Sequence, residues 1–159
     1  MPQRTASLLV AFATTACFAS SEPPRPELSI AFPEAVDAGS VHDAVLSVSN
    51  PGPEDIDPLF VSFTWVGVGG AQDVPTPIVN LGARGENRSV LEVSPEPVGV
   101  STDGTVYRFG SLPEGESMTI TFTLRVPQES GVAANAVTVY DGGEIDRARG
   151  VRLQATVRR

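Results

Sequence analysis

The chain has 159 residues, room for one domain once a leader is set aside, and carries 19 acidic against 11 basic residues, for a formal net charge of −8. Every basic residue is an arginine, and the sequence shows no basic cluster. Affinity for nucleic acid comes largely from basic side chains that neutralise phosphates, so nucleic acid is excluded as an expected partner. One cysteine, Cys17, excludes an intramolecular disulfide.

The N-terminus has the pattern of an export signal. One arginine, Arg4, precedes an apolar run over residues 8–13 that continues through small residues to position 16. The run is shorter than the roughly 20 apolar residues that span a bilayer, but it fits the core of a signal peptide. We therefore expect residues 1–16 to be a signal peptide and the protein to be exported to the cell envelope.

Cys17 leaves two interpretations of the leader open. The sequence Thr14-Thr15-Ala16-Cys17 resembles the bacterial lipobox, and the stretch that follows, residues 17–26, reads as a flexible tether. The resemblance implies lipidation of Cys17 and attachment of the protein to the membrane. The alternative is ordinary cleavage near Ala19, which discards Cys17 and leaves a secreted or periplasmic protein.

From position 27 onward, short runs of alternating apolar and polar residues end at Gly, Pro, Asn or Asp, which is the pattern of an all-β protein. The clearest run covers residues 117–126, where the apolar residues recur at every second position over ten residues. The pattern predicts strands at 28–32, 44–49, 59–66, 105–109, 117–126, 134–140 and 151–157, with a weaker one at 88–93. Seven or eight strands without helical periodicity predict one immunoglobulin-like β-sandwich over residues 27–159.

Three sequence pieces carry a resemblance to a known kind of module: the turn Asn50-Pro51-Gly52 after a strand, the segment Leu112-Pro113-Glu114-Gly115-Glu116-Ser117, and the threonine-rich strand after it. In order and spacing they resemble the immunoglobulin-like modules of bacterial surface proteins, namely the conserved-repeat domains of unknown function and the cell-adhesion-related domains. The resemblance implies a sandwich fold and a binding or structural role at the cell surface.

Residues with catalytic potential are few. The single histidine, His42, is expected to be an exposed residue at a strand end, and the sequence has no Gly-x-Ser-x-Gly motif to supply a nucleophile. One histidine and one leader cysteine cannot form a usual zinc site. The acidic loops at 54–57 and 141–146 carry carboxylates of the kind that calcium favours, but neither matches a 12-residue calcium-binding loop, so calcium binding is the minor alternative and solvated acidic loops are expected. We expect no enzymatic activity and no cofactor.

The expected function is therefore a cell-envelope binding or structural module whose partner is an unidentified envelope protein or glycan. A carbohydrate-binding domain is the alternative, and an envelope hydrolase is the less favoured one. The candidate ligand contacts are the aromatic side chains of Trp65, Tyr107 and Tyr140. Alternation within residues 59–66 nevertheless places Trp65 on the same face as Leu59, which predicts a role in core packing.

Overall fold

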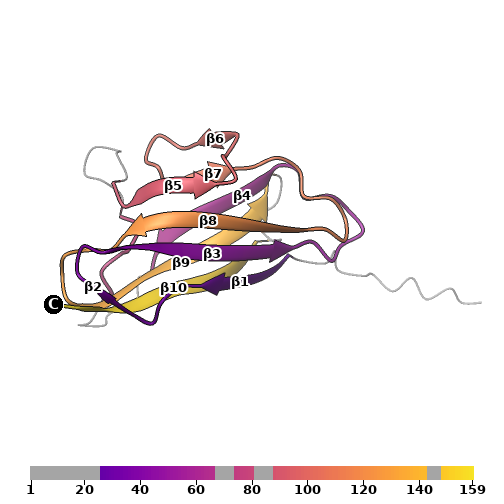
Figure 1. Ribbon diagram of the computed structural model, residues 1–159. Helices are drawn as coiled ribbons and strands as arrows, with labels where there is room; N and C mark the ends of the chain where they lie inside the picture. Colours follow the sequence, from indigo (N-terminus) through magenta and orange to yellow (C-terminus); the bar gives the residue numbers. More distant parts are fainter. Residues whose placement is uncertain (1–25, 67–73, 81–87, 143–147) are drawn as a thin grey trace, which may run out of the picture.

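The computed structural model describes residues 26–66, 74–80, 88–142 and 148–159, so the predicted signal peptide and Cys17 lie outside the described part (Figure 1). The described residues form ten strands and no helix. The strands are β1 (Glu27–Ala31), β2 (Ala35–Asp37), β3 (Val41–Ser49), β4 (Leu59–Trp65), β5 (Val90–Ser94), β6 (Gly99–Val100), β7 (Val106–Arg108), β8 (Ser117–Arg125), β9 (Gly131–Asp141) and β10 (Arg149–Arg158).

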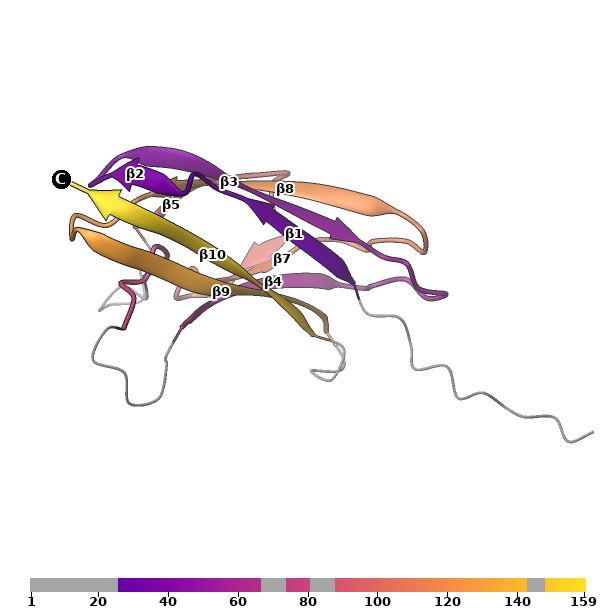
Figure 2. The same cartoon turned by 90° about the horizontal axis from the view of Figure 1, so that it is seen from below.

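The strands form two sheets that pack face to face (Figures 1 and 2). One sheet has the order β1-β3-β8-β5, and the other has the order β2-β10-β9-β4-β7-β6. All paired strands are antiparallel except β2 and β10, which are parallel. The predicted all-β, immunoglobulin-like sandwich is confirmed.

Each of the eight predicted strands is present, and the two additional strands are short edge strands. β2 has three residues and β6 has two. Segments of this length contain too few residues to show an alternation, so their pairing is set by the neighbouring strand rather than by their own pattern. β2 takes its position because Val36 is buried in the core and the strand runs alongside the end of β10.

Aromatic rings from both sheets meet at the centre of the core. Phe122 projects inward from β8 and contacts Phe63 and Tyr107, which project from β4 and β7 of the other sheet. The ring centroids lie 5.0 Å and 5.2 Å from that of Phe122, in edge-to-face geometry. Such pairs add about 0.5–1.5 kcal/mol beyond the area that they bury. In a sandwich without a disulfide, these contacts join the two sheets through packing alone.

A buried asparagine closes the end of the sandwich where β3 finishes. The side-chain amide of Asn50 donates to the carbonyl oxygens of Glu54 at 2.8 Å and Leu112 at 3.0 Å, and its oxygen accepts from the N–H of Gly52 at 3.2 Å. The Asn50 backbone carbonyl also accepts from the N–H of Gly115, whose φ of 72° suits glycine. The two turn sequences that carried the family resemblance are therefore bonded to each other through Asn50.

We expect Asn50→Ala to lower the free energy of unfolding by about 2 kcal/mol or more, because it leaves buried backbone groups of two loops without partners. Urea unfolding followed by far-ultraviolet circular dichroism measures the change. Gln154→Ala is the matched control, since it removes an exposed amide side chain from β10. An Asn50→Ala protein as stable as this control would contradict the assigned role.

Candidate functional site

Trp65 lies at the surface rather than in the core, which corrects the packing role predicted for it. Its side chain is 65% exposed at the last residue of β4. Leu59, Val61 and Phe63 of the same strand are buried, as the alternation predicted. Periodicity thus identified the correct side of the strand for three residues but not the point at which the sheet ends.

Asn135 explains why Trp65 does not enter the core. It pairs with Trp65 across β4 and β9, and its buried amide donates to the carbonyl oxygens of Thr64 at 3.3 Å and Val79 at 3.0 Å. Its oxygen accepts from the N–H of Val79 at 2.8 Å. These bonds hold residues 74–80 against the end of the sandwich, so that Val79 fills the space near the core that Trp65 leaves.

Residues 74–80 also continue the sheet beyond β4. The N–H of Thr76 donates to the carbonyl of Val132 at 3.1 Å, and the N–H of Ala134 donates to the carbonyl of Thr76 at 2.9 Å. Thr76 therefore forms a parallel bridge with Ala133, beside the part of β9 that β4 does not reach. The segment is anchored on one side by this bridge and on the other by the Asn135 amide.

A pocket of about 260 Å³ lies between Trp65 and this segment. Its lining residues are Phe63, Trp65, Pro77, Val79, Asn80 and Asn135. None of them carries a charge, although the chain has 19 acidic residues and 11 arginines. An uncharged pocket with an aromatic wall favours an uncharged ligand that presents a flat or ring-shaped apolar face.

Two polar groups line this pocket, and they differ in availability. Both N–H donors of the Asn135 amide are used by the carbonyls of Thr64 and Val79, and its oxygen accepts from the N–H of Val79. Asn80 is exposed, and its side chain makes no hydrogen bond within the described residues. An amide offers both donors and an acceptor, so Asn80 can bond a ligand hydroxyl while the ligand ring packs on Trp65. Trp65 and Asn80 together form what we call the Trp65 site.

The other two predicted ligand contacts lie elsewhere. Tyr107 is buried in the core, and its hydroxyl donates to the carbonyl of Gly104 at 2.8 Å. Burial, together with the charge of Asp103, raises the pKa of the Tyr107 hydroxyl to about 12. Tyr107 is therefore a structural residue and not a ligand contact. Tyr140 is half-buried on the outer face of the six-stranded sheet, away from the core.

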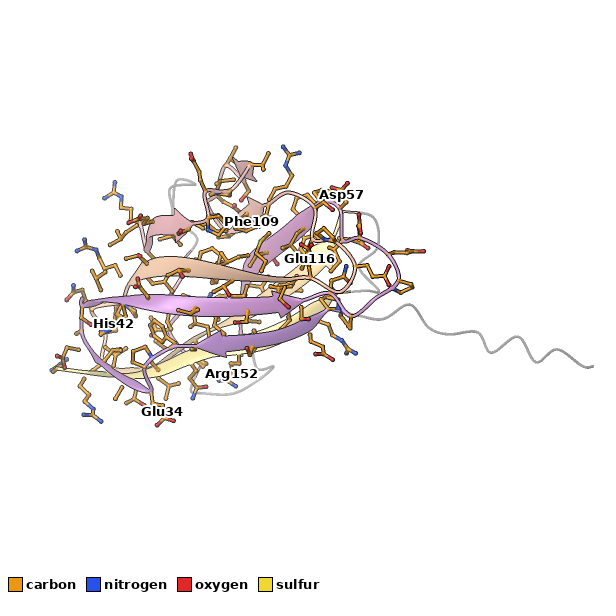
Figure 3. All side chains as sticks on the ribbon, turned by 45° about the vertical axis from the view of Figure 1, so that its right-hand side comes forward. Glu34, His42, Asp57, Phe109, Glu116 and Arg152 are labelled. Carbon is orange, nitrogen blue, oxygen red and sulfur yellow. The ribbon has the colours of Figure 1, made fainter. Side chains whose placement is uncertain are left out.

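His42 is half-buried at the second residue of β3, rather than exposed (Figure 3). Its Nε2 lies 2.9 Å from Oγ of Ser40, and its ring contacts that of Phe32. The Ser40 hydroxyl donates its single proton to the carbonyl of Asp37 at 2.5 Å. The Ser40 oxygen therefore accepts from Nε2–H of His42, and this polarity is opposite to that of a histidine base activating a serine.

The described residues contain no group of three or more His, Cys, Asp or Glu side chains placed to hold a metal ion. Within the same residues, no helix is long and apolar enough to cross a membrane.

No protein-family model and no curated protein matches the chain. Similar solved structures include the ASH/PapD-like domain of human CEP192, with 16% identity, coverage of 99% of this chain and 96% of that one, and a TM-score of 0.42. The CARDB domain of a Pyrococcus furiosus protein has 16% identity, coverage of 84% and 95%, and a TM-score of 0.45. The bacterial hydrophobin BslA has 8% identity, coverage of 84% and 98%, and a TM-score of 0.48.

These similarities are distant, with identities below 25% and TM-scores below 0.5. They carry no conclusion about the function of this chain. The class of protein is defined instead by its own two sheets, which make it an immunoglobulin-like β-sandwich domain.

Sequence reasoning missed Asn135, Pro77 and Asn80 as parts of the site. One signal for Asn135 was present: it is the polar residue at the inward positions of β9, between Ala133 and Val137. A buried amide requires hydrogen-bond partners, which predicts that another segment packs against it. No pattern in residues 74–80 indicates that this segment is that partner.

We expect Asn135→Ala to lower the free energy of unfolding by about 1–3 kcal/mol, because it leaves the N–H of Val79 without its bond in a buried position. Urea unfolding provides the measurement. Asn80→Ala serves as the control, because it removes an exposed amide from the same pocket. Equal stabilities of the two variants would show that the Asn135 bonds do not hold this segment.

Proposed function

We propose that this protein is an exported, non-catalytic binding module of the cell envelope that is anchored through a lipid on Cys17 and binds its ligand at the Trp65 site. The observation that carries the proposal is the exposure of the single tryptophan at the wall of an uncharged pocket. The exposed indole contributes little to the core, whereas it offers a rigid apolar surface to a ligand.

The Trp65 site lies at the opposite end of the sandwich from the proposed N-terminal anchor, which supports a role in binding a ligand away from the membrane. β1 begins at Glu27, which pairs with Ser49 of β3, and Ser49 pairs in turn with Ser117 of β8. These three residues therefore lie at one end of the sandwich. Trp65 lies at the other end, where β4 terminates (Figures 1 and 2). A nine-residue strand such as β3 separates the two ends by about 30 Å. An anchor that precedes Glu27 therefore leaves the Trp65 site on the far side of the domain.

The ligand class that the Trp65 site favours is a neutral glycan. Sugar rings present an apolar face that packs on an indole and hydroxyl groups that an amide can bond. The pocket volume of about 260 Å³ suits one ring rather than a large ligand. An aliphatic side chain of an envelope protein is the other occupant of suitable size, and it would leave the Asn80 amide unused.

Fluorescence of the single tryptophan tests this assignment directly. We expect the emission of Trp65 in the native protein to resemble that of the unfolded chain, because its ring is already exposed, and to shift to shorter wavelength when a bound glycan covers it. Trp65→Ala is expected to lower the affinity of the purified protein for a glycan identified on a glycan array by a factor of about 30 or more, which corresponds to about 2 kcal/mol.

Val98→Ala is the matched control for this experiment, since Val98 is also 65% exposed but does not line the pocket. Asn80→Ala is expected to weaken glycan binding by a smaller factor. If no glycan binds but affinity capture from envelope extracts yields a protein whose binding requires Trp65, the ligand is a protein side chain. Loss of binding that is equal in the Trp65 and Val98 variants would reject the site.

Lipid attachment has a separate test. Mass spectrometry of the membrane fraction is expected to show a diacylglyceryl group on Cys17, and Cys17→Ala is expected to release the protein from that fraction. Glycan affinity should be unchanged in Cys17→Ala, because the Trp65 site lies at the opposite end of the domain. A mature protein that starts near Ser20 and is found in the soluble fraction would reject the anchor.

A further inference from the structure

We propose that the outer face of the six-stranded sheet is a second binding surface, and that it binds an acidic polysaccharide. This surface is separate from the Trp65 site and does not depend on it. Its central residues are Arg108 on β7, Arg152 on β10, and the aromatic pair of Phe60 and Tyr140 on β4 and β9.

Charge is segregated between the outer faces of the two sheets. The outward positions of the six-stranded sheet contain three arginines and one carboxylate, Asp37 of β2, in a chain with 19 acidic residues. The outward positions of the four-stranded sheet contain three carboxylates, Glu27, Asp43 and Glu92, and one arginine, Arg125. The six-stranded sheet is therefore the basic face of an acidic protein, and it attracts anions by electrostatic complementarity.

The arginines of this face are available to a ligand. Arg108 and Arg152 are exposed, and neither makes an ion pair within the described residues. Arg152 projects from the outer side of its sheet (Figure 3). The third arginine, Arg158, pairs in register with Asp37 of β2, so its charge is locally offset. The basic character therefore comes mainly from Arg108 and Arg152.

The spacing of the charges indicates the kind of anion. Arg152 lies in a row with Ala136 and Thr64, whereas Arg108 lies opposite Phe60, four residues earlier on β4. Strand spacing and rise place the two arginines about 20 Å apart. One small anion cannot contact both guanidinium groups. A ligand that uses both of them must carry repeated charges along an extended chain.

The aromatic pair of Phe60 and Tyr140 indicates that the polymeric ligand contains rings. Phe60 and Tyr140 are stacked, with centroids 5.2 Å apart and an interplanar angle of 11°, and both are half-buried. Arg108 lies across from Phe60 in the strand register, and its guanidinium packs over Gly99 of β6, so its charge borders the aromatic pair on the same face. A sugar ring with a carboxylate presents both an apolar face for the rings and an anion for bidentate binding by arginine.

Other polymeric or macromolecular partners fit less well. Two or three arginines are fewer than the roughly 6–10 phosphate contacts of typical nucleic-acid binding. A duplex carries one charge for about every 1.7 Å of its axis, so a protein with a net charge of −8 repels it more strongly than a polysaccharide with one carboxylate on each sugar. The same net charge disfavours association with a second copy. The sequence alone does not show this basic face, because Arg108 and Arg152 are far apart in the chain and are brought to one face of the sheet only by strand pairing.

The test uses labelled alginate, a polymer of uronic acids, and uncharged dextran, with binding to the purified protein followed by fluorescence anisotropy. We expect binding to alginate and not to dextran. The double variant R108Q/R152Q is expected to bind about tenfold more weakly, as for two partly exposed charge contacts. Binding should weaken as salt is added. A plot of the logarithm of the affinity constant against the logarithm of the salt concentration should have a negative slope of at most about 3 in magnitude, because the face carries only three arginines.

R125Q/R159Q is the matched control, because it makes the same charge change at exposed arginines outside this face. It is expected to retain alginate affinity within a factor of about two, as is Trp65→Ala, which separates this proposal from the glycan site. Equal losses in the two double variants, or tighter binding to phosphatidylglycerol vesicles or duplex DNA than to alginate, would overturn the proposal. Sedimentation showing a dimer that R108Q/R152Q dissociates would assign the face to self-association instead.

Discussion

A β-sandwich is open at both ends, and in this protein a buried asparagine closes each of them. Strand alternation fills the space between the sheets with apolar side chains, but at the ends the loops bring backbone N–H and C=O groups close to the core. Those groups must be bonded, and the carboxamides of Asn50 and Asn135 supply both donors and acceptors at the two ends. The remaining architecture depends on this closure, since no disulfide joins the sheets.

The two closures have different consequences. At the Asn50 end, the two loops are bonded to each other, and Ile56 and Leu112 cover the core by exchanging backbone hydrogen bonds. At the Asn135 end, the Asn135 side chain holds residues 74–80 over the core through its bonds to Val79, and Trp65 lies at the surface. The bonded loops therefore cover the core at the Asn50 end, while a pocket remains beside Trp65 at the Asn135 end. The same physical requirement thus yields a structural turn at one end and a candidate ligand site at the other.

The sequence predicted the fold well because most of the fold depends on alternation, which is local. The ten-residue pattern around Phe122 identified both a strand and its inward face, and the burial of Ile120 and Leu124 agrees with it. Alternation does not report where a sheet ends, so Trp65 was assigned to the core. Nor does it report pairing between distant segments, which alone brings Val79 to Asn135 and Arg108 to the face that carries Arg152. The candidate sites depend on such non-local contacts.

The energetics of Trp65 support a role for it beyond folding. Asn135 and Val79 already complete the end of the core, so the fold does not require an aromatic ring at position 65. Leaving a large apolar side chain mostly in water forgoes the free energy of its burial, about 25 cal/mol for each Å² of apolar surface. A smaller or polar side chain at this position would avoid that loss without breaking a contact that the core uses. A ligand that covers the indole recovers this free energy on binding, and for this reason we place the recognition surface at Trp65 rather than at the buried rings of Tyr107 and Phe63.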